Sequence, residues 1–105
     1  MARYLLQASY THQGLAGLVS NPEDPSEVIK TLTESVGGKV ITFDYCFGEF
    51  DIAGVFEMPD DTAMASVVMV AGASGRVTNL RTTVLIPIAD GLAAAQRANE
   101  ISHSG

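Results

Sequence analysis

The sequence contains few of the residues that commonly build metal, redox or nucleic acid sites. It has one cysteine, Cys46, which excludes an intrachain disulfide and a CxxC motif. Its two histidines, His12 and His103, are too few for a histidine-rich metal site, and we expect no metal and no cofactor. The 6 basic residues stand against 12 acidic ones, for a formal net charge of −6. Because an acidic surface repels phosphate groups, we expect neither a nucleic acid nor a membrane as partner.

Long apolar runs and the common catalytic motifs are also missing. No apolar run approaches the length that spans a bilayer, and the first four residues lead into a predicted strand instead of a charged and then apolar leader. We therefore expect a cytoplasmic protein. No glycine-rich phosphate loop follows a strand, and no GxSxG motif is present. With 105 residues, 47% of them hydrophobic, the chain is expected to form a single domain over residues 1–105.

The stretch from Lys39 to Met58 carries the clearest structural pattern. It is rich in β-branched and aromatic residues, which suit a pleated and half-buried surface. Glycine takes a positive φ at no steric cost, so Gly48 is a natural place for the chain to reverse. The pattern therefore predicts two strands joined by a tight turn at Gly48-Glu49. The residues that carry it are Val40, Ile41, Phe43, Tyr45, Phe47, Phe50, Ile52, Val55 and Phe56.

Strands and helices are predicted on both sides of this hairpin. Thr11 is expected to cap a short helix, and Asp24 to cap a second helix with Glu27 completing a capping box. The apolar spacing of that second helix turns four side chains toward the sheet. They are Val28, Ile29, Leu32 and Val36. The other expected elements are a strand over residues 3–10, a helix from residue 59 to about 72, a strand over 77–86, a helix over 88–100 and a frayed tail over 101–105.

This order predicts the fold class. The chain reads as β-α-β-β-α-β, an α+β ferredoxin-like domain with a four-stranded antiparallel sheet, an extra short helix after the first strand and a C-terminal helix. In several strands two successive residues are apolar, as in Leu5 and Leu6 or Val84 and Leu85. Successive side chains point to opposite faces, so both faces of the sheet are expected to carry apolar residues. The helices can cover only one face of the sheet. We therefore expect the chain itself to be its own partner, as a homodimer or higher oligomer that covers the second face.

Several short pieces of the chain match one known pattern in their order and spacing. They are Arg3-Tyr4-Leu5-Leu6, Tyr10-Thr11, Gly14-Leu15, Gly37-Gly38-Lys39, Phe47-Gly48-Glu49-Phe50-Asp51 and Met58-Pro59-Asp60. In these pieces the sequence resembles the GYD domain family of small bacterial and archaeal proteins. The likeness covers residues 3 to about 88, and its order and spacing are more specific than any one motif. Phe50 stands where the family pattern has tyrosine, so a role that needs that hydroxyl is absent or moved here. The resemblance implies a dimeric α/β barrel, in a superfamily that includes antibiotic-biosynthesis-type monooxygenases, and it implies no established activity.

Asp51 is one candidate site residue. As a carboxylate at the edge of a cleft it can act as a base or ligand. As a turn residue it accepts backbone N–H groups and fixes the hairpin, which is common for aspartate beside a glycine turn. The turn role is the more frequent one, and we interpret Gly48, Phe50 and Asp51 mainly as a structural motif.

Four further residues are candidates for binding or catalysis. His12 follows the first strand and can overlook a cleft as an acid, base or ligand. Arg81 can bind a carboxylate if it points into a cavity, or it can pair with Asp44 or Glu57 on a neighbouring strand. Tyr10 and Tyr45 carry polar tips on strands and are candidate ligand-binding residues beside His12.

The sequence leaves the function open among three hypotheses. The first is an uncharacterised small dimeric barrel that binds a small apolar molecule between sheet and helices. The second is a cofactor-free monooxygenase or isomerase on the same fold, using His12, Asp51 or Arg81 as catalytic residues. The third is a structural protein that assembles into a homo-oligomer. Whether the protein is an enzyme therefore stays undecided from the sequence, since fold is a poor guide to function.

Overall fold

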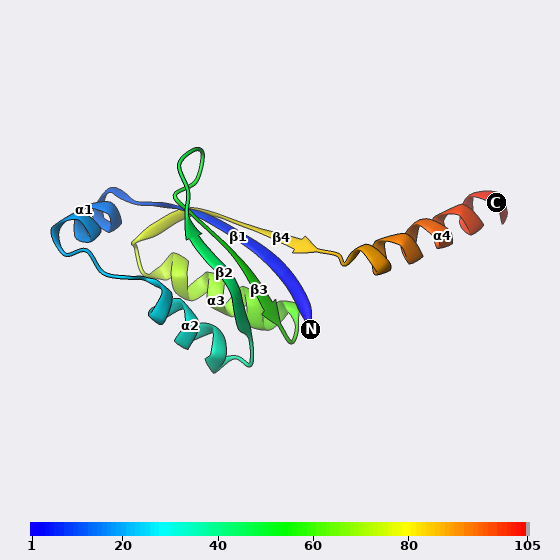
Figure 1. Ribbon diagram of the computed structural model, residues 1–105, viewed down its shortest axis with the longest axis horizontal. Coiled ribbons are helices and arrows are strands. Elements are labelled where there is room, and N and C mark those ends of the chain that lie inside the picture. Colours follow the sequence, from blue (N-terminus) through cyan, green and yellow to red (C-terminus); the bar gives the residue numbers. More distant parts are fainter. Residues whose placement is uncertain (105) are drawn as a thin grey trace.

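A computed structural model describes residues 1–104 of the chain, and its elements follow the predicted order (Figure 1). The ferredoxin-like α+β fold is confirmed, with one extra helix between the first strand and the first crossover helix and another at the C-terminus. The elements are β1 (Ala2–Tyr10), α1 (His12–Ser20), α2 (Ser26–Ser35), β2 (Lys39–Tyr45), β3 (Ile52–Met58), α3 (Asp61–Ala73), β4 (Val77–Leu85) and α4 (Ile88–Ser104).

The four strands form one antiparallel sheet in the order β2-β3-β1-β4. Strand β1 lies between β3 and β4, so Tyr4 stands opposite Phe56 on one side and Val84 on the other. The pairing register of β1 with β4 shifts between Gln7 and Ser9 of β1. On the facing part of β4, Asn79 adopts a positive φ of 51°. Asparagine tolerates this conformation better than most residues, so it suits an irregularity in a strand.

The core lies between the sheet and the two helices α2 and α3, which cover the same face (Figure 1). The even-numbered side chains of β1 and β3 point into this core, as period-two alternation requires. Helix α3 contributes Met64 and Val67, and the partly buried Ile29, Leu32 and Val36 pack from α2 and its C-terminus. The buried cluster consists of Tyr4, Leu6, Phe56, Met58, Met64 and Val67.

The helix ends follow local sequence with one exception. The Thr11 hydroxyl accepts from Gly14 N–H and caps α1 as predicted, and Gly37 ends α2 with a positive φ of 81°. The predicted capping box of α2 is wrong, because the helix begins at Ser26 and Asp24 instead accepts that residue's N–H at 2.8 Å. Val28 is 73% exposed, so its predicted orientation toward the sheet is also wrong.

The central hairpin differs from the predicted tight turn. Strand β2 ends at Tyr45 and β3 begins at Ile52, which leaves a six-residue connection. Gly48 is not among the glycines with positive φ, and Phe47 projects into solvent. Both strands are therefore shorter than the β-branched and aromatic residues of the sequence predicted.

The second face of the sheet carries a mixed set of side chains. Leu5 and Val55 are paired and partly exposed there, but Arg3 and Glu57 on the same face form an ion pair at 2.8 Å. Gln7 stands opposite Arg81 on the adjoining strand. This face is thus less uniformly apolar than the sequence pattern suggested, and the dimeric barrel remains a prediction.

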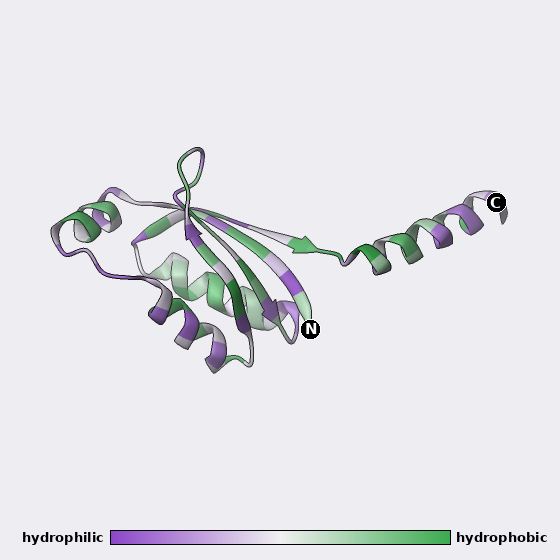
Figure 2. Ribbon diagram, in the orientation of Figure 1, coloured by the Kyte–Doolittle hydropathy of each residue, from purple (hydrophilic) through white to green (hydrophobic). Residues whose placement is uncertain are grey.

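Helix α4 extends away from the body of the molecule (Figure 1). Only Ile86 and Pro87 separate it from β4, and the helix runs through Ser104. The expectation of a frayed tail is therefore wrong for 101–104, while residue 105 lies outside the described residues. Figure 2 shows apolar residues along the first turns of α4, and both Ile88 and Leu92 are exposed.

Candidate functional site

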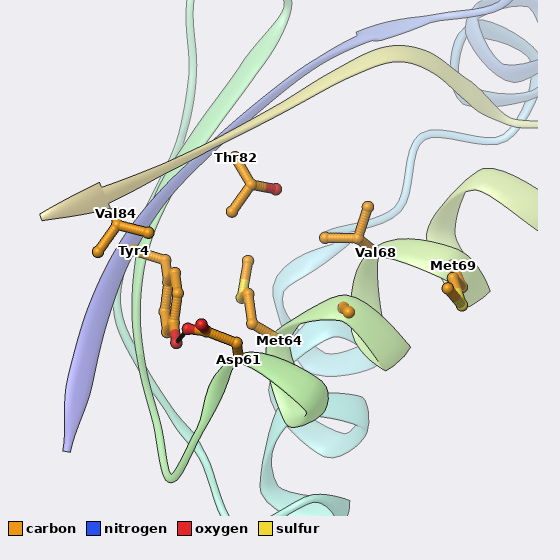
Figure 3. Close-up of a pocket in the computed structure, with 8 residues that line it drawn as sticks. Tyr4, Asp61, Met64, Val68, Met69, Thr82 and Val84 are labelled. Carbon is orange, nitrogen blue, oxygen red and sulfur yellow. Dashed lines mark hydrogen bonds between the residues drawn. The ribbon is translucent and has the colours of Figure 1, made fainter.

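An apolar cavity of about 330 Å³ lies between α3 and the edge strand β4 (Figure 3). Its walls come from the sheet face that packs against the helices and from one side of α3. The volume is at the lower end of the range typical of small-molecule pockets. The lining residues are Tyr4, Asp61, Met64, Ala65, Val68, Met69, Thr82 and Val84.

The sequence pattern of α3 explains why this cavity is apolar. The helix is apolar on almost every side, yet only Met64 and Val67 are fully buried. Met69 is 72% exposed at the cavity wall, and Val84 on the facing strand is also exposed. Strand β4 is the edge of the sheet, so no fifth strand in the described chain covers this side. The cavity is thus an uncovered continuation of the core.

One end of the cavity holds a tyrosine and a carboxylate. The Tyr4 hydroxyl donates a hydrogen bond to Asp61 Oδ1, as the dashed line in Figure 3 marks. Tyr4 is only 2% exposed, whereas Asp61 lies at the exposed first turn of α3. Asp60 precedes it and caps the helix by accepting the N–H of Ala63 at 2.8 Å. The hydrogen-bonded pair of Tyr4 and Asp61, called the Tyr4–Asp61 dyad below, therefore joins β1 to the start of α3.

The hydrogen bond to Asp61 raises the pKa of Tyr4 from 10.0 to about 12, with smaller contributions from burial and from the charges of Asp61 and Asp60. The folded chain consequently holds this proton more tightly than the unfolded chain does. The resulting stabilisation is fully present below pH 10, and it is lost as the pH rises through about 12.

We predict that Asp61→Asn lowers the pKa of the Tyr4 phenol toward 10, because the carboxylate is the main cause of the shift. Phenolate absorbance after a stopped-flow pH jump measures the ionisation before the chain unfolds. Tyr4→Phe identifies which phenol is responsible, since it removes one phenol from the titration near pH 12. An unchanged titration curve in Asp61→Asn contradicts the assignment.

The predicted site residues Asp51, Tyr10 and Tyr45 gather at the opposite end of the sheet. Tyr10 follows Tyr4 by six residues on β1, which separates the two ends by roughly 20 Å. Asp51 Oδ2 accepts the backbone N–H of Tyr10 at 2.7 Å, and Asp51 N–H donates to the carbonyl of Ala8 at 3.0 Å. The carboxylate thus holds the hairpin end against β1, which is the structural role considered for it.

We predict that Asp51→Ala lowers the free energy of unfolding by about 1–2 kcal/mol, because the Tyr10 N–H loses its acceptor. Chemical denaturation measures the change. Asp44→Ala is the matched control, since Asp44 is an exposed aspartate on the neighbouring strand, and it is expected to change stability by less than about 0.5 kcal/mol. Equal effects of the two substitutions contradict the structural role of Asp51.

Tyr10 has a raised pKa of about 12, caused first by burial and then by the neighbouring Tyr45 and Asp51. Arg81 lies over the ring of Phe50, with its guanidinium carbon 5.3 Å from the ring centroid. Its carboxylate neighbour is Glu49 at 3.9 Å, so the predicted pairing with Asp44 or Glu57 is wrong. None of these residues lines the cavity between α3 and β4.

His12 begins α1 and is exposed, and it does not line this cavity either. Among residues 1–104, no group of three histidine, cysteine, aspartate or glutamate side chains is arranged to hold a metal ion. In the same part of the chain, no helix has both the length and the apolar character to cross a membrane.

Tyr4 and Asp61 were not predicted as site residues. Tyr4 looked like an ordinary strand residue, and Asp61 looked like a helix-start carboxylate. Their proximity depends on the antiparallel pairing of β1 with β3, since Met58 at the end of β3 stands opposite Ala2 and α3 begins three residues later. The aspartate three residues after the end of the predicted third strand was the available signal.

A family model described as the GYD domain matches residues 4–95. The matched region contains both walls of the cavity, the Tyr4–Asp61 dyad and the hairpin end around Asp51. Among curated proteins, none is similar enough to count as a match.

Proposed function

The chain belongs to the GYD domain family, and from that premise we propose that it is a small homodimeric α/β barrel protein that binds a small apolar molecule between its sheet and its helices. The observation that carries this proposal is the cavity of about 330 Å³ between α3 and β4. Scaling from an engineered cavity of about 150 Å³ that binds benzene, this volume suits a ligand of about a dozen non-hydrogen atoms.

The composition of the walls supports an apolar ligand. Aliphatic and thioether side chains make up most of the lining, and only Tyr4, Asp61 and Thr82 bring polar side-chain atoms. Ligand pockets typically combine such an apolar lining with a few polar groups that orient the ligand. Phe43 and Phe56 pack against each other in the core, 6.5 Å between centroids, so neither ring fills this space.

The homodimer is supported by the apolar part of the open sheet face. Leu5 and Val55 stand opposite each other there, and Leu85 lies beside Arg3 on the same face. Apposing this face with a second copy removes the leucine and valine side chains from water, at about 25 cal/mol for each Å² of apolar surface buried. The Arg3–Glu57 pair lies two residues along β1 and β3 from Leu5 and Val55, near the end of the two strands, and suits a polar rim.

Indole binding tests the ligand proposal. The chain has no tryptophan, so indole fluorescence reports binding without protein indole background. Ala65 lines the cavity, and Ala65→Phe is expected to fill it and weaken binding at least about tenfold. Ala73→Phe is the matched control on the same helix, outside the cavity, and is expected to leave affinity unchanged. Equal binding of indole by Ala65→Phe and Ala73→Phe overturns the proposal that the ligand binds in this cavity.

Light scattering after size-exclusion chromatography tests the homodimer. The original chain is expected to run as a dimer at micromolar concentration, and Val55→Lys as a single protomer, because a charge then replaces the centre of the face. Met69→Lys serves as a control on an exposed part of α3 and should remain dimeric. A stably folded single protomer of the original chain contradicts the dimer and leaves the cavity proposal to the indole test. A larger assembly favours the homo-oligomeric alternative.

The oxygenase or isomerase alternative gains no support from the candidate residues. His12, Asp51 and Arg81 all lie outside the lining of the cavity. A ligand bound between α3 and β4 therefore does not meet them within this protomer.

A further inference from the structure

We infer that the ligand of this cavity is a small apolar amine, with its ammonium group bound to Asp61 and its apolar body between α3 and β4. The inference rests on the proposed function, because it assigns the ligand class of the same cavity. It depends on the chemistry of the single polar end, which Figure 3 shows beside Tyr4.

Only one of the two carboxylate oxygens of Asp61 accepts a hydrogen bond within the described part of the chain. Its Oδ1 accepts the hydrogen bond from Tyr4. Over residues 1–104, no donor is found for its Oδ2, so this oxygen is available to a ligand. A bound ammonium group can donate to it and to solvent at the cavity mouth, since a primary ammonium carries three donors.

Asp61 also lacks a cationic partner in the described part of the chain. The two ion pairs found there are Arg3–Glu57 and Arg81–Glu49, and both lie away from the cavity. Asp60 adds a second negative charge next to Asp61, and the whole chain has a net charge of −6. The field at this end of the cavity therefore attracts a cation and repels an anion.

Tyr4 contributes to this selectivity as a positioning residue. Its hydroxyl proton is committed to Asp61, so it offers no donor to a ligand carboxylate or phosphate. The remaining polar side chain, Thr82, has a hydroxyl that can donate or accept and thus does not discriminate. The polar end of the cavity is consequently an acceptor of hydrogen bonds.

The apolar walls define the other half of the ligand. Met64 and Met69 bring two thioethers, which adapt to irregular shapes and make favourable contacts with aromatic rings. Val68 and Val84 complete an aliphatic surface on the two facing elements. An aromatic ring on a short alkyl chain that ends in an amine satisfies both halves.

Three probes with the same ring and a similar chain length test the inference. They are 2-phenylethylamine, 2-phenylethanol and phenylacetate, titrated against the full chain by isothermal calorimetry at low ionic strength. We expect the amine to bind about tenfold more tightly than the alcohol, as a charge-assisted hydrogen bond replaces a neutral one. Phenylacetate is expected to bind least.

Two matched substitutions separate the cavity carboxylate from the general charge. Asp61→Asn keeps the shape of the side chain and is expected to bring the amine and the alcohol to equal affinity. Asp60→Asn removes the same charge from the adjacent residue, and asparagine still caps the helix, so the preference for the amine should survive.

The results separate failure of the inference from failure of the proposed function. Phenylacetate binding as tightly as the amine overturns the inference, and so does an amine preference that persists in Asp61→Asn or falls equally in Asp60→Asn. Continued binding of the alcohol in those cases leaves the apolar-ligand proposal intact. If neither indole nor any of the three probes binds, the proposed function and the inference both fail.

Discussion

Gly14→Ala is expected to destabilise the fold by about 3 kcal/mol. A Cβ atom at this position would lie 2.1 Å from the carbonyl oxygen of Arg76, which is a backbone atom and cannot rotate away. The same oxygen accepts the N–H of Thr11 at 2.9 Å, and the Thr11 hydroxyl donates to the carbonyl of Gly75 at 2.7 Å. Relieving the clash therefore separates α1 from the start of β4 and breaks these hydrogen bonds.

Gly17→Ala provides the matched comparison. It makes the same substitution on the same helix, and its Cβ would meet nothing within 4 Å. Because alanine favours a helix over glycine, this variant is expected to gain about 0.5–1 kcal/mol. Chemical denaturation of both variants measures the difference. Equal stability of the two contradicts the close approach between α1 and β4.

Phe56→Ala is expected to lower the free energy of unfolding by about 3–5 kcal/mol. The ring is 0% exposed and meets Phe43 edge to face, at an interplanar angle of 72°. Gly54 makes room for both rings, since a Cβ there would lie 2.9 Å from Phe43 and 3.0 Å from Phe56. Folded domains have a total stability of about 5–15 kcal/mol, so this loss approaches the whole at the lower end of that range.

Phe47→Ala is the control, because Phe47 is 103% exposed and belongs to the hairpin connection. It is expected to change stability by less than about 0.5 kcal/mol. Phe56→Leu keeps part of the core volume and gives a measurable intermediate if Phe56→Ala does not fold. If the free energy of unfolding of Phe56→Ala lies within about 1 kcal/mol of that of the original chain, the central place of Phe56 in the core is contradicted.

The sequence predicted the order of the elements because each carries a strong local pattern. Thr11 caps α1 where predicted, and Gly37 ends α2 through the positive φ that glycine adopts readily; both are short-range effects. The α2 start was misplaced because Asp24 bonds locally to Ser26 instead of capping as a helix residue. The hairpin turn was misplaced because aromatic residues occur in its connection as well as in its strands, as Phe47 shows.

The orientation of the sheet was the main feature that apolar spacing left open. Leu5 and Leu6 are both apolar, yet Leu6 is buried against the helices and Leu5 lies on the other face. The charged residues of the strands indicate which face of the sheet is open. Arg3, Glu57 and Arg81 all belong to the open face, and a charge there stays in contact with water.

The candidate site was not predictable from local motifs. His12 and Arg81 were chosen for their chemistry, but the cavity is lined by residues whose types are ordinary for a core. Tyr4 and Asp61 acquire their hydrogen bond only through pairing between elements 57 residues apart in the sequence. A contact over that distance depends on register, and register follows from the whole sheet.

Helix α4 has a consequence for how the chain unfolds. No other helix or strand of the described chain packs substantially against it, and Gly91 weakens it from within. Most helical stability in proteins comes from the packing of an apolar face, and α4 lacks such packing within the described chain. The backbone amides of α4 are therefore expected to exchange with deuterium within seconds in a lone protomer, long before those of β1 and β3, so their protection would report contact with another molecule.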